Sequence, residues 1–319
     1  MKITKQLQDQ LLTTIDIAMQ AALKVYAQDD FGIQTKSDQS PVTAADLEVN
    51  RILTETLHEH TPDIPVVSEE DNNLTWEDRQ KLDLFWIIDP IDGTKEFIKK
   101  SGEFTINLGL IKNQKPIFGV IAIPITGEVF WGGQEMEHCP VGCGQERENC
   151  PTTWTGTASY VRKPTLDFEA TLGSPPKFST FQIRAREMQK ADHIVTLGST
   201  PEFQTLAYST LVDITCSKDH LHANDTAFIK NIAKDHYIKL KPCGSTIKIC
   251  RIAEGEADLY IRTGGINDWD LAAGHAIIEA AGGRVSTLDG KDLVYNTETQ
   301  KLAPFIVHGA TKLDWTKYL

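Results

Sequence analysis

An apolar run that ends in two closely spaced carboxylates constrains this chain more than any other feature. The run LFWII at 84–88 has the pattern of a buried strand, and it leads directly into the hexapeptide DPIDGT at 89–94. Because Pro90 restricts the backbone, Asp89 and Asp92 are expected to converge on one small volume at the strand end. Carboxylates that close repel each other unless a proton or a cation lies between them, and hard oxygen ligands suit Mg²⁺ or Mn²⁺.

Length and composition are those of an ordinary globular protein. The 319 residues are 40% hydrophobic and 24% charged, enough for a substantial core and for two subdomains, which we place at 1–205 and 206–319. The net charge of −12 argues against a nucleic-acid-binding surface. It would also repel a phosphorylated substrate, so a phosphate site in this chain requires metal ions that reverse the local charge.

Cellular location is inferred from segments that the sequence lacks. No apolar run approaches membrane-spanning length, and the start, MKITKQ, has no apolar signal core. The six cysteines are irregularly spaced, which favours reduced thiols and the cytoplasm. A peripheral position on the inner face of the cell membrane stays open.

Periodicity predicts helices first and then an antiparallel sheet. Apolar positions at helical spacing predict a helix over about 5–27, and a second begins near Thr43, a predicted N-cap with Asp46 at the capping-box position. Strands are predicted at 64–68, 84–88, 105–111, 117–123 and 128–131. Farther on, strands at 211–216, 257–261, 283–285 and 305–307 alternate with helices at 225–233, 245–253 and 269–281, which indicates an α/β subdomain.

The segment from about 132 to 182 has little periodicity, and we interpret it as a long loop or an extended hairpin. It holds Cys139, Cys143 and Cys150 at a spacing that matches no recognised zinc site. Reduced cysteines in a surface insertion are the favoured interpretation.

Two further acidic groups complete a candidate metal site. Glu69 and Glu70 follow a predicted strand, and Asp270 lies at the start of a predicted helix, where an acid can equally serve as a cap. Together with Asp89 and Asp92 they supply enough oxygen ligands for two metal ions about 4 Å apart, the arrangement used in phosphoryl transfer.

Four segments in this order resemble the lithium-sensitive, Mg²⁺-dependent phosphatases of the inositol monophosphatase superfamily: SPVTAAD at 40–46, SEE at 68–70, DPIDGT at 89–94 and WDLAAG at 269–274. The resemblance implies a layered αβαβα fold of the α+β class and frequently a homodimer. It also implies two or three Mg²⁺ ions per site, with Mn²⁺ as a substitute.

The resemblance assigns roles residue by residue. The metal ligands would be Glu69, Asp89, the main-chain carbonyl of Ile91, Asp92 and Asp270. Thr94 and Asp46 resemble the pair that orients and activates the attacking water, and Glu70 resembles an acid that orients a water on a further metal.

Two segments favour one branch, the 3′(2′),5′-bisphosphate nucleotidases of the CysQ type. KEF at 95–97 and GSTIK at 244–248 resemble that branch, and Gly244 and Ser245 would open a helix with free amides, with Lys248 adding positive charge. This predicts a second phosphate site, and hence hydrolysis of the 3′-phosphate of adenosine 3′,5′-bisphosphate to AMP. The competing interpretation of Lys248 is a solvated helix face.

The predicted substrate contacts also include Gly93, Thr94, Ser217 and His220. The segment SKDH at 217–220 stands where the branch has Ser-Arg-Ser-His. Lys218 lacks the planar fork of arginine, and Asp219 adds a negative charge, so this departure bears on which substrate is used.

The motifs leave three alternative interpretations. An aspartyl-phosphate enzyme is disfavoured, because its acids are two residues apart and Pro90 stands where its second acid would be. An inositol or sugar phosphatase of the same superfamily would not need Lys248. A catalytically silent sensor of phosphorylated metabolites would be expected to lack a ligand acid or the water-activating pair, and all of these are present.

Overall fold

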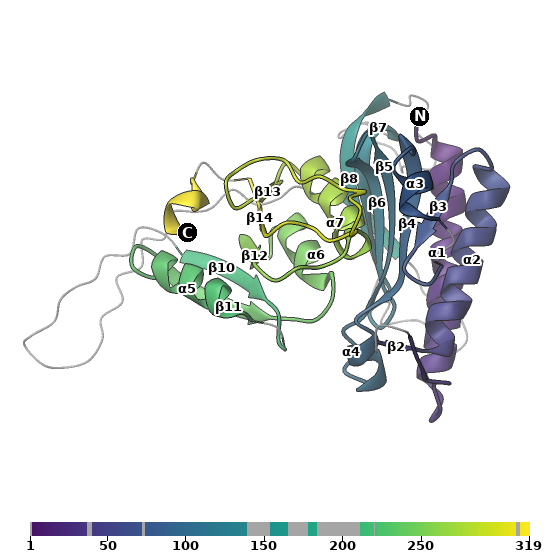
Figure 1. The fold of residues 1–319 in the computed structure, drawn as a ribbon, viewed down its shortest axis with the longest axis horizontal. Coiled ribbons are helices and arrows are strands. Elements are labelled where there is room, and N and C mark those ends of the chain that lie inside the picture. Colours follow the sequence, from purple (N-terminus) through teal and green to yellow (C-terminus); the bar gives the residue numbers. More distant parts are fainter. Residues whose placement is uncertain are drawn as a thin grey trace, which may run out of the picture.

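The computed structural model describes residues 2–36, 40–71, 74–138, 154–164, 178–183, 211–219, 221–310 and 313–319. The described elements form five layers in the order helices, sheet, helices, sheet, helix (Figure 1). This confirms the predicted αβαβα architecture. No helix in the described part of the chain is both long enough and apolar enough to span a membrane.

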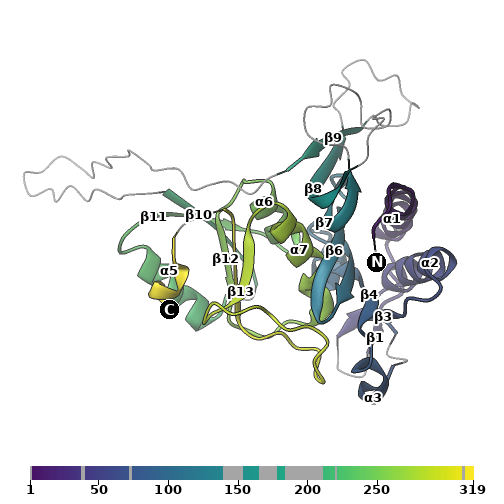
Figure 2. The same ribbon diagram turned by 90° about the horizontal axis from the view of Figure 1, so that it is seen from above.

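The first layer is a pair of helices, α1 (Lys5–Tyr26) and α2 (Ala44–His60), lying side by side in Figures 1 and 2. Both begin where the sequence predicts. Thr4 caps α1, and Thr43 caps α2 in a complete capping box with Asp46. Their apolar faces, which include Leu11 and Leu53, pack on the large sheet in one core cluster.

The second layer is a seven-stranded sheet in the order β3-β4-β5-β6-β7-β8-β9. Only the β3–β4 pair is parallel; every other neighbouring pair is antiparallel. The bounds are β3 Val66–Ser68, β4 Leu84–Asp92, β5 Thr105–Lys112, β6 Lys115–Ile123, β7 Glu128–His138, β8 Trp154–Pro164 and β9 Phe178–Gln182.

The region from 132 to 182 is mostly sheet where it is described, which supports an extended hairpin over a long loop. Strand β7 continues to His138, β8 returns beside it, and β9 adds a further strand. The prediction about Cys139, Cys143 and Cys150 lies outside the described residues. So does the boundary predicted near residue 205, which stays a prediction.

The central layer consists of α6 (Ile247–Ala253) and α7 (Asp268–Ala280), which separate the two sheets (Figure 1). Helix α7 is buried on nearly all sides and contacts β4, β5, β6, β7, β8 and β13. Its fit against the large sheet depends on Gly119 in β6, where an added Cβ would lie 2.2 Å from the carbonyl oxygen of Ala273.

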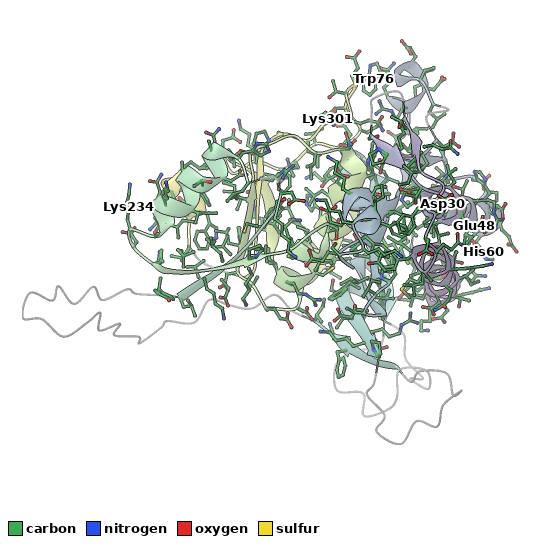
Figure 3. All side chains as sticks on the ribbon, turned by 90° about the horizontal axis from the view of Figure 1, so that it is seen from below. Asp30, Glu48, His60, Trp76, Lys234 and Lys301 are labelled. Carbon is green, nitrogen blue, oxygen red and sulfur yellow. The ribbon has the colours of Figure 1, made fainter. Side chains whose placement is uncertain are left out.

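The fourth layer is a five-stranded sheet in the order β11-β10-β12-β14-β13, and α5 (Ala223–Ile232) and the short 3₁₀ helix η2 (Trp315–Tyr318) cover its outer face. The strands are β10 Leu211–Cys216, β11 Tyr237–Pro242, β12 Leu259–Arg262, β13 Arg284–Thr287 and β14 Phe305–His308. In Figure 3, Lys234 beyond α5 lies at the opposite end of the molecule from Glu48 and His60 on α2.

Six short elements were not predicted. They are β1 (Gln34–Thr35), β2 (Pro41–Val42), α3 (Trp76–Arg79), α4 (Thr94–Ile98), β11 and η2. Strand β11 is an edge strand exposed along most of its length, so it lacks the apolar alternation that marks half-buried strands.

Candidate functional site

The site is built at the end of β4, where the strand register is interrupted. Pairing with β5 shifts between Asp89 and Asp92, and Gly93 then takes a left-handed conformation, with φ of 92°, before α4 begins. This conformation is open to glycine at little cost, and it turns the chain so that Thr94 starts a new helix. The buried strand is confirmed but extends to Asp92, beyond the predicted 84–88, so the turn begins only at Gly93.

Three carboxylates meet at this turn. One ligand oxygen each from Asp89, Asp92 and Asp270 can be chosen so that all lie within 4.8 Å of one another. Asp270 comes from the first turn of α7, where its Oδ2 also accepts the Asn267 backbone N–H at 2.6 Å. Asp270 is therefore both a capping-box residue and a member of the acidic cluster.

The charges in this cluster are poorly compensated by protein groups. Both carboxylate oxygens of Asp89 are buried, and neither has a hydrogen-bond partner among the described residues. Burial, followed by repulsion from Glu69, Asp92 and Asp270, raises the pKa of Asp89 well above its usual range. Burial and the neighbouring Asp92 carboxylate likewise raise the pKa of Asp270.

A divalent cation fits this donor set. All donors are hard oxygens, their spacing suits a shared ion, and the Asp89 carboxylate has no protein donor to offset its charge. Magnesium or manganese is favoured over softer metals, since the cluster contains neither sulfur nor imidazole.

Glu69 and Glu70 lie beside the cluster and share one lysine. The ammonium group of Lys36 is 2.8 Å from Glu69 Oε1 and 2.7 Å from Glu70 Oε1. Although burial opposes it, attraction to these carboxylates raises the pKa of Lys36. Burial raises the pKa of Glu70 to about 7 despite this lysine. Lys36 was not predicted as a site residue; it directly follows β1, a strand of two residues that the sequence pattern does not reveal.

The predicted water-activating pair is brought together. Thr94 Oγ1 lies 3.4 Å from Asp46 Oδ1 and 3.2 Å from the carbonyl oxygen of Ile91. The other Asp46 oxygen accepts the Thr43 N–H at 2.8 Å and the Thr43 hydroxyl at 2.6 Å, so the capping box fixes its orientation. Burial raises the pKa of Asp46.

A pocket of about 290 Å³ opens beside these groups. Its walls include Glu69, Asp92, Gly93, Thr94 and Asp270 from the acidic cluster and Ser217, Gly244 and Ser245 from the predicted substrate contacts. Four cationic side chains also line it: Lys95, Lys218, Lys248 and Arg262. The pocket thus combines a group of carboxylates with several cationic side chains.

Lys248 is a buried residue of this pocket, so its interpretation as part of a solvated helix face is wrong. Its side chain is 7% exposed, and its ammonium group donates to the carbonyls of Ser245 at 2.5 Å and Cys243 at 3.3 Å. It also lies 5.6 Å from the centre of the Tyr260 ring. Burial lowers the pKa of Lys248.

A second prediction that needs correction is that the backbone amides before α6 are free. The helix begins at Ile247 rather than at Ser245. The Gly244 N–H donates to Glu103 Oε2 at 2.9 Å, and the Thr246 N–H donates to Asp92 at 2.5 Å. The Glu103 carboxylate therefore occupies one of the two amides that the sequence offered to a phosphate, that of Gly244, and Asp92 occupies the nearby amide of Thr246.

The unusual residues of the 217–220 segment are paired with partners from the large-sheet side. Lys218 lies 2.6 Å from Glu103 Oε1, and Asp219 lies 2.9 Å from the ammonium group of Lys99. Lys99 offsets the negative charge that Asp219 adds near the pocket. His220 lies outside the described residues.

Comparison with known proteins decides the family. The model of the inositol monophosphatase family matches residues 5–163 and 181–311. This chain belongs to that family. Among relatives, the 3′(2′),5′-bisphosphate nucleotidase CysQ of Escherichia coli strain K12 is 34% identical over 93% of this chain and 96% of its own.

Solved structures of the family agree with the fold. The crystal structure of CysQ from Bacteroides thetaiotaomicron is 30% identical and covers 92% of this chain and 93% of its own, with a TM-score of 0.63. The Thermotoga maritima IMPase TM1415 is 21% identical, with a TM-score of 0.60, and shares the fold. It covers 95% of this chain and 92% of its own.

Arg262 is a further pocket residue that the sequence reasoning missed. It ends β12, and its Nε donates to the Gly264 carbonyl at 3.2 Å. The signal that could have found Arg262 is a cation directly after the predicted apolar strand at 257–261. Asp92 of the acidic cluster likewise stands at the end of a strand. Its position adds a planar, permanently charged donor to the pocket.

Proposed function

We propose that this chain is a Mg²⁺-dependent phosphatase that removes the 3′-phosphate of adenosine 3′,5′-bisphosphate, yielding AMP and inorganic phosphate. The observation that carries the proposal is the buried, unpartnered Asp89 carboxylate beside a pocket that also holds Lys248 and Arg262. The first feature calls for a cation, and the second suits an additional phosphate. The names of the CysQ relatives support the choice of substrate.

The metal ions would be held by Glu69, Asp89, the Ile91 carbonyl, Asp92 and Asp270, with room for two or three Mg²⁺, or Mn²⁺ in their place. When bound, such ions neutralise phosphate charge and lower the pKa of water, which supplies a nucleophile at neutral pH.

The remaining steps belong to side chains of this chain. Thr94 and Asp46 form a hydrogen-bonded pair within reach of the cluster, so Asp46 can accept a proton from water that Thr94 orients. The raised pKa of Asp46 suits it to hold that proton. Glu70 would orient a second water, with its charge balanced by Lys36.

The substrate would lie across the pocket. Gly93 and Thr94 would contact the phosphate that is removed. Ser245, Lys248 and Arg262 would bind the 5′-phosphate, where arginine and lysine supply charge-assisted hydrogen bonds. Ser217 and His220 would contact the nucleoside.

The test is phosphate release from adenosine 3′,5′-bisphosphate, inositol 1-phosphate and fructose 1,6-bisphosphate, each with Mg²⁺ and with or without lithium. A strong preference for the nucleotide, inhibited by lithium, is the expected result. A preference for inositol phosphate would assign the chain to the other branch and remove the role given to Lys248. No release from any substrate would favour a silent sensor.

A further inference from the structure

The turn that leads into α6, residues 243–248 with the first two residues of the helix included, holds one of the carboxylates of the proposed metal site. The backbone N–H of Thr246 and its hydroxyl both lie 2.5 Å from Asp92 Oδ2. Thr246 is only 4% exposed, so water does not compete effectively for these bonds. Hydrogen bonds to an ionised carboxylate are short and about twice as strong as neutral ones.

A second buried residue fixes the direction of the hydroxyl bond. Asn107, on β5 and 1% exposed, donates its amide Nδ2–H to Thr246 Oγ1 at 2.9 Å. Because the hydroxyl oxygen accepts from Asn107, its one proton is left for Asp92 Oδ2 at 2.5 Å or for the Asp270 carbonyl oxygen at 3.2 Å, and the shorter contact to a charged acceptor favours Asp92. The chain Asn107, Thr246, Asp92 therefore runs from the large sheet through the turn and back to the strand end.

These bonds decide which oxygen of Asp92 faces a cation. All the donors that reach Asp92 within the described part of the chain approach Oδ2: the two from Thr246 and a longer one from the Thr105 hydroxyl at 3.4 Å. The Oδ1 atom is left for a metal ion. The carboxylate is thus oriented before any ion arrives.

We propose that Thr246 is a positioning residue for the metal ligand Asp92 and that Asn107 orients it. The inference rests on the proposed function only for the identity of Asp92 as a ligand. Partners of metal ligands typically change metal affinity by about 10–100-fold when they are removed.

The same turn also carries the lysine assigned to the second phosphate. Lys248 donates back to the carbonyls of Ser245 and Cys243, and Ser245 has a positive φ of 43°, unusual for a residue with a side chain. One turn thereby orients a metal ligand and a phosphate-side cation. Thr246 is the residue that anchors it to the acidic cluster.

The experiment measures Mn²⁺ binding to the full chain by calorimetry, without substrate. Thr246→Val keeps the side-chain shape and the backbone N–H but removes the hydroxyl, and it is expected to weaken Mn²⁺ binding by about 10–100-fold. Thr246→Ser restores the hydroxyl and is expected to bind within about threefold of the parent protein. Thr14→Val is the matched control, because Thr14 is also buried but donates to the Gln10 carbonyl in α1.

Three outcomes would overturn the inference. They are parental affinity in Thr246→Val, equal weakening in Thr246→Ser and Thr246→Val, or equal weakening in the Thr14→Val control. If Thr246→Val does not fold, Asn107→Ala replaces it. A loss of about 3–10-fold is expected in Asn107→Ala, and parental affinity in that variant overturns the inference.

Failure of the parent protein itself to bind Mn²⁺ would refute the metal site of the proposed function, and the inference with it. Since no substrate is present, a wrong choice of phosphate ester leaves the result unchanged.

Discussion

At the scale of single residues, the acids of this site also hold the local backbone. Asp46 and Asp270 are each the third helical residue, N3, of a capping box, and each accepts the N–H of its own helix cap. Asp92 accepts the amide of Thr246. Because these bonds fix the carboxylates before a ligand binds, the site needs little reorganisation when it is occupied.

Asp89 is the exception, since its carboxylate has no donor among the described residues. We expect Asp89→Asn to lower phosphatase activity at least about a hundredfold, because a ligand to the metal is lost. Its melting temperature in EDTA is expected to be no lower than that of the parent protein, because the raised pKa shows that the native state disfavours this charge.

Steady-state kinetics and thermal unfolding check this expectation, with Asp16→Asn on α1 as the control. Parental activity in Asp89→Asn would contradict its role as a ligand. A large drop in its melting temperature would show that the carboxylate serves the fold instead.

Lys248 tests the second phosphate site. Lys248→Met keeps the apolar stem in its buried position and removes the ammonium group. We expect KM for adenosine 3′,5′-bisphosphate to rise by about tenfold or more, the worth of one charge-assisted hydrogen bond, while KM for a monophosphate changes little. Parallel kinetics on the two substrates measure the difference, and equal increases would argue that Lys248 only supports the turn.

At the scale of elements, the functional groups come from places where regular structure begins or ends. Strand β4 breaks register at its end, α4 starts at Thr94, and α7 brings Asp270 in its first turn. A second contact between element ends lies near the C-terminus. There Tyr318 of η2 packs on His236, the residue directly before β11.

The contact between His236 and Tyr318 predicts a pH dependence of stability. His236 is 4% exposed, its Nε2 lies 2.8 Å from Tyr318 Oη, and its Nδ1 has no partner in the described residues. Burial lowers the pKa of His236 below 6.5, outweighing the attraction of Asp235. Between pH 6.5 and 5.5 the unfolded chain therefore gains a proton that the native state resists, and stability falls as the pH falls.

Relative to His236→Gln, the parent protein should lose up to about 1 kcal/mol of unfolding free energy across that interval. Urea unfolding of both proteins at pH 7.5, 6.5 and 5.5 gives the difference directly. A constant difference across this range would show that His236 is protonated equally in the two states.

At the scale of the whole molecule, the site depends on the packing of α6 and α7 between the two sheets. Asp89 and Asp92 come from the large sheet, whereas Asp270 comes from α7, which packs against that sheet and also contacts β13. A partly buried group of ion pairs joins α6 to the large sheet: Glu128 of β7 pairs with Arg251 of α6, and Lys163 of β8 pairs with Glu254 at the end of α6.

The close approach of β6 to α7 gives a prediction at this scale. In Gly119→Ala the new Cβ would lie 2.2 Å from the Ala273 carbonyl oxygen and 2.7 Å from its Cα, which are backbone atoms that cannot turn aside. We expect a loss of about 1–3 kcal/mol of stability together with weaker Mn²⁺ binding, because α7 carries Asp270. Chemical unfolding and calorimetry measure both.

Gly265→Ala is the matched control, because no heavy atom of a described residue other than its chain neighbours lies within 4 Å of its added Cβ. Unchanged Mn²⁺ affinity in Gly119→Ala would mean that α7 can shift without moving Asp270.

Features that depend on residues close in the sequence were predicted better than features that depend on residues far apart in it. The capping box of Thr43 and Asp46, the hairpin of β5 and β6 and the turn at Gly93 were all predicted correctly, since each depends on residues close in sequence. Strand β11 was missed because its exposed edge carries no apolar alternation. Lys248 could be read as exposed because one turn of a short helix does not reveal what packs against it.

What the sequence by itself determined is the chemistry of the site: which residues are acids, which caps orient them, and that a metal must balance them. Tertiary structure alone decided which distant groups meet, as when Thr246 reaches Asp92, Lys36 bridges Glu69 and Glu70, and Glu103 takes the Gly244 amide. The physical reason is that caps and turns are closed by hydrogen bonds within a few residues. The distant pairs form only when packed layers bring remote backbone together, and no local pattern encodes that approach.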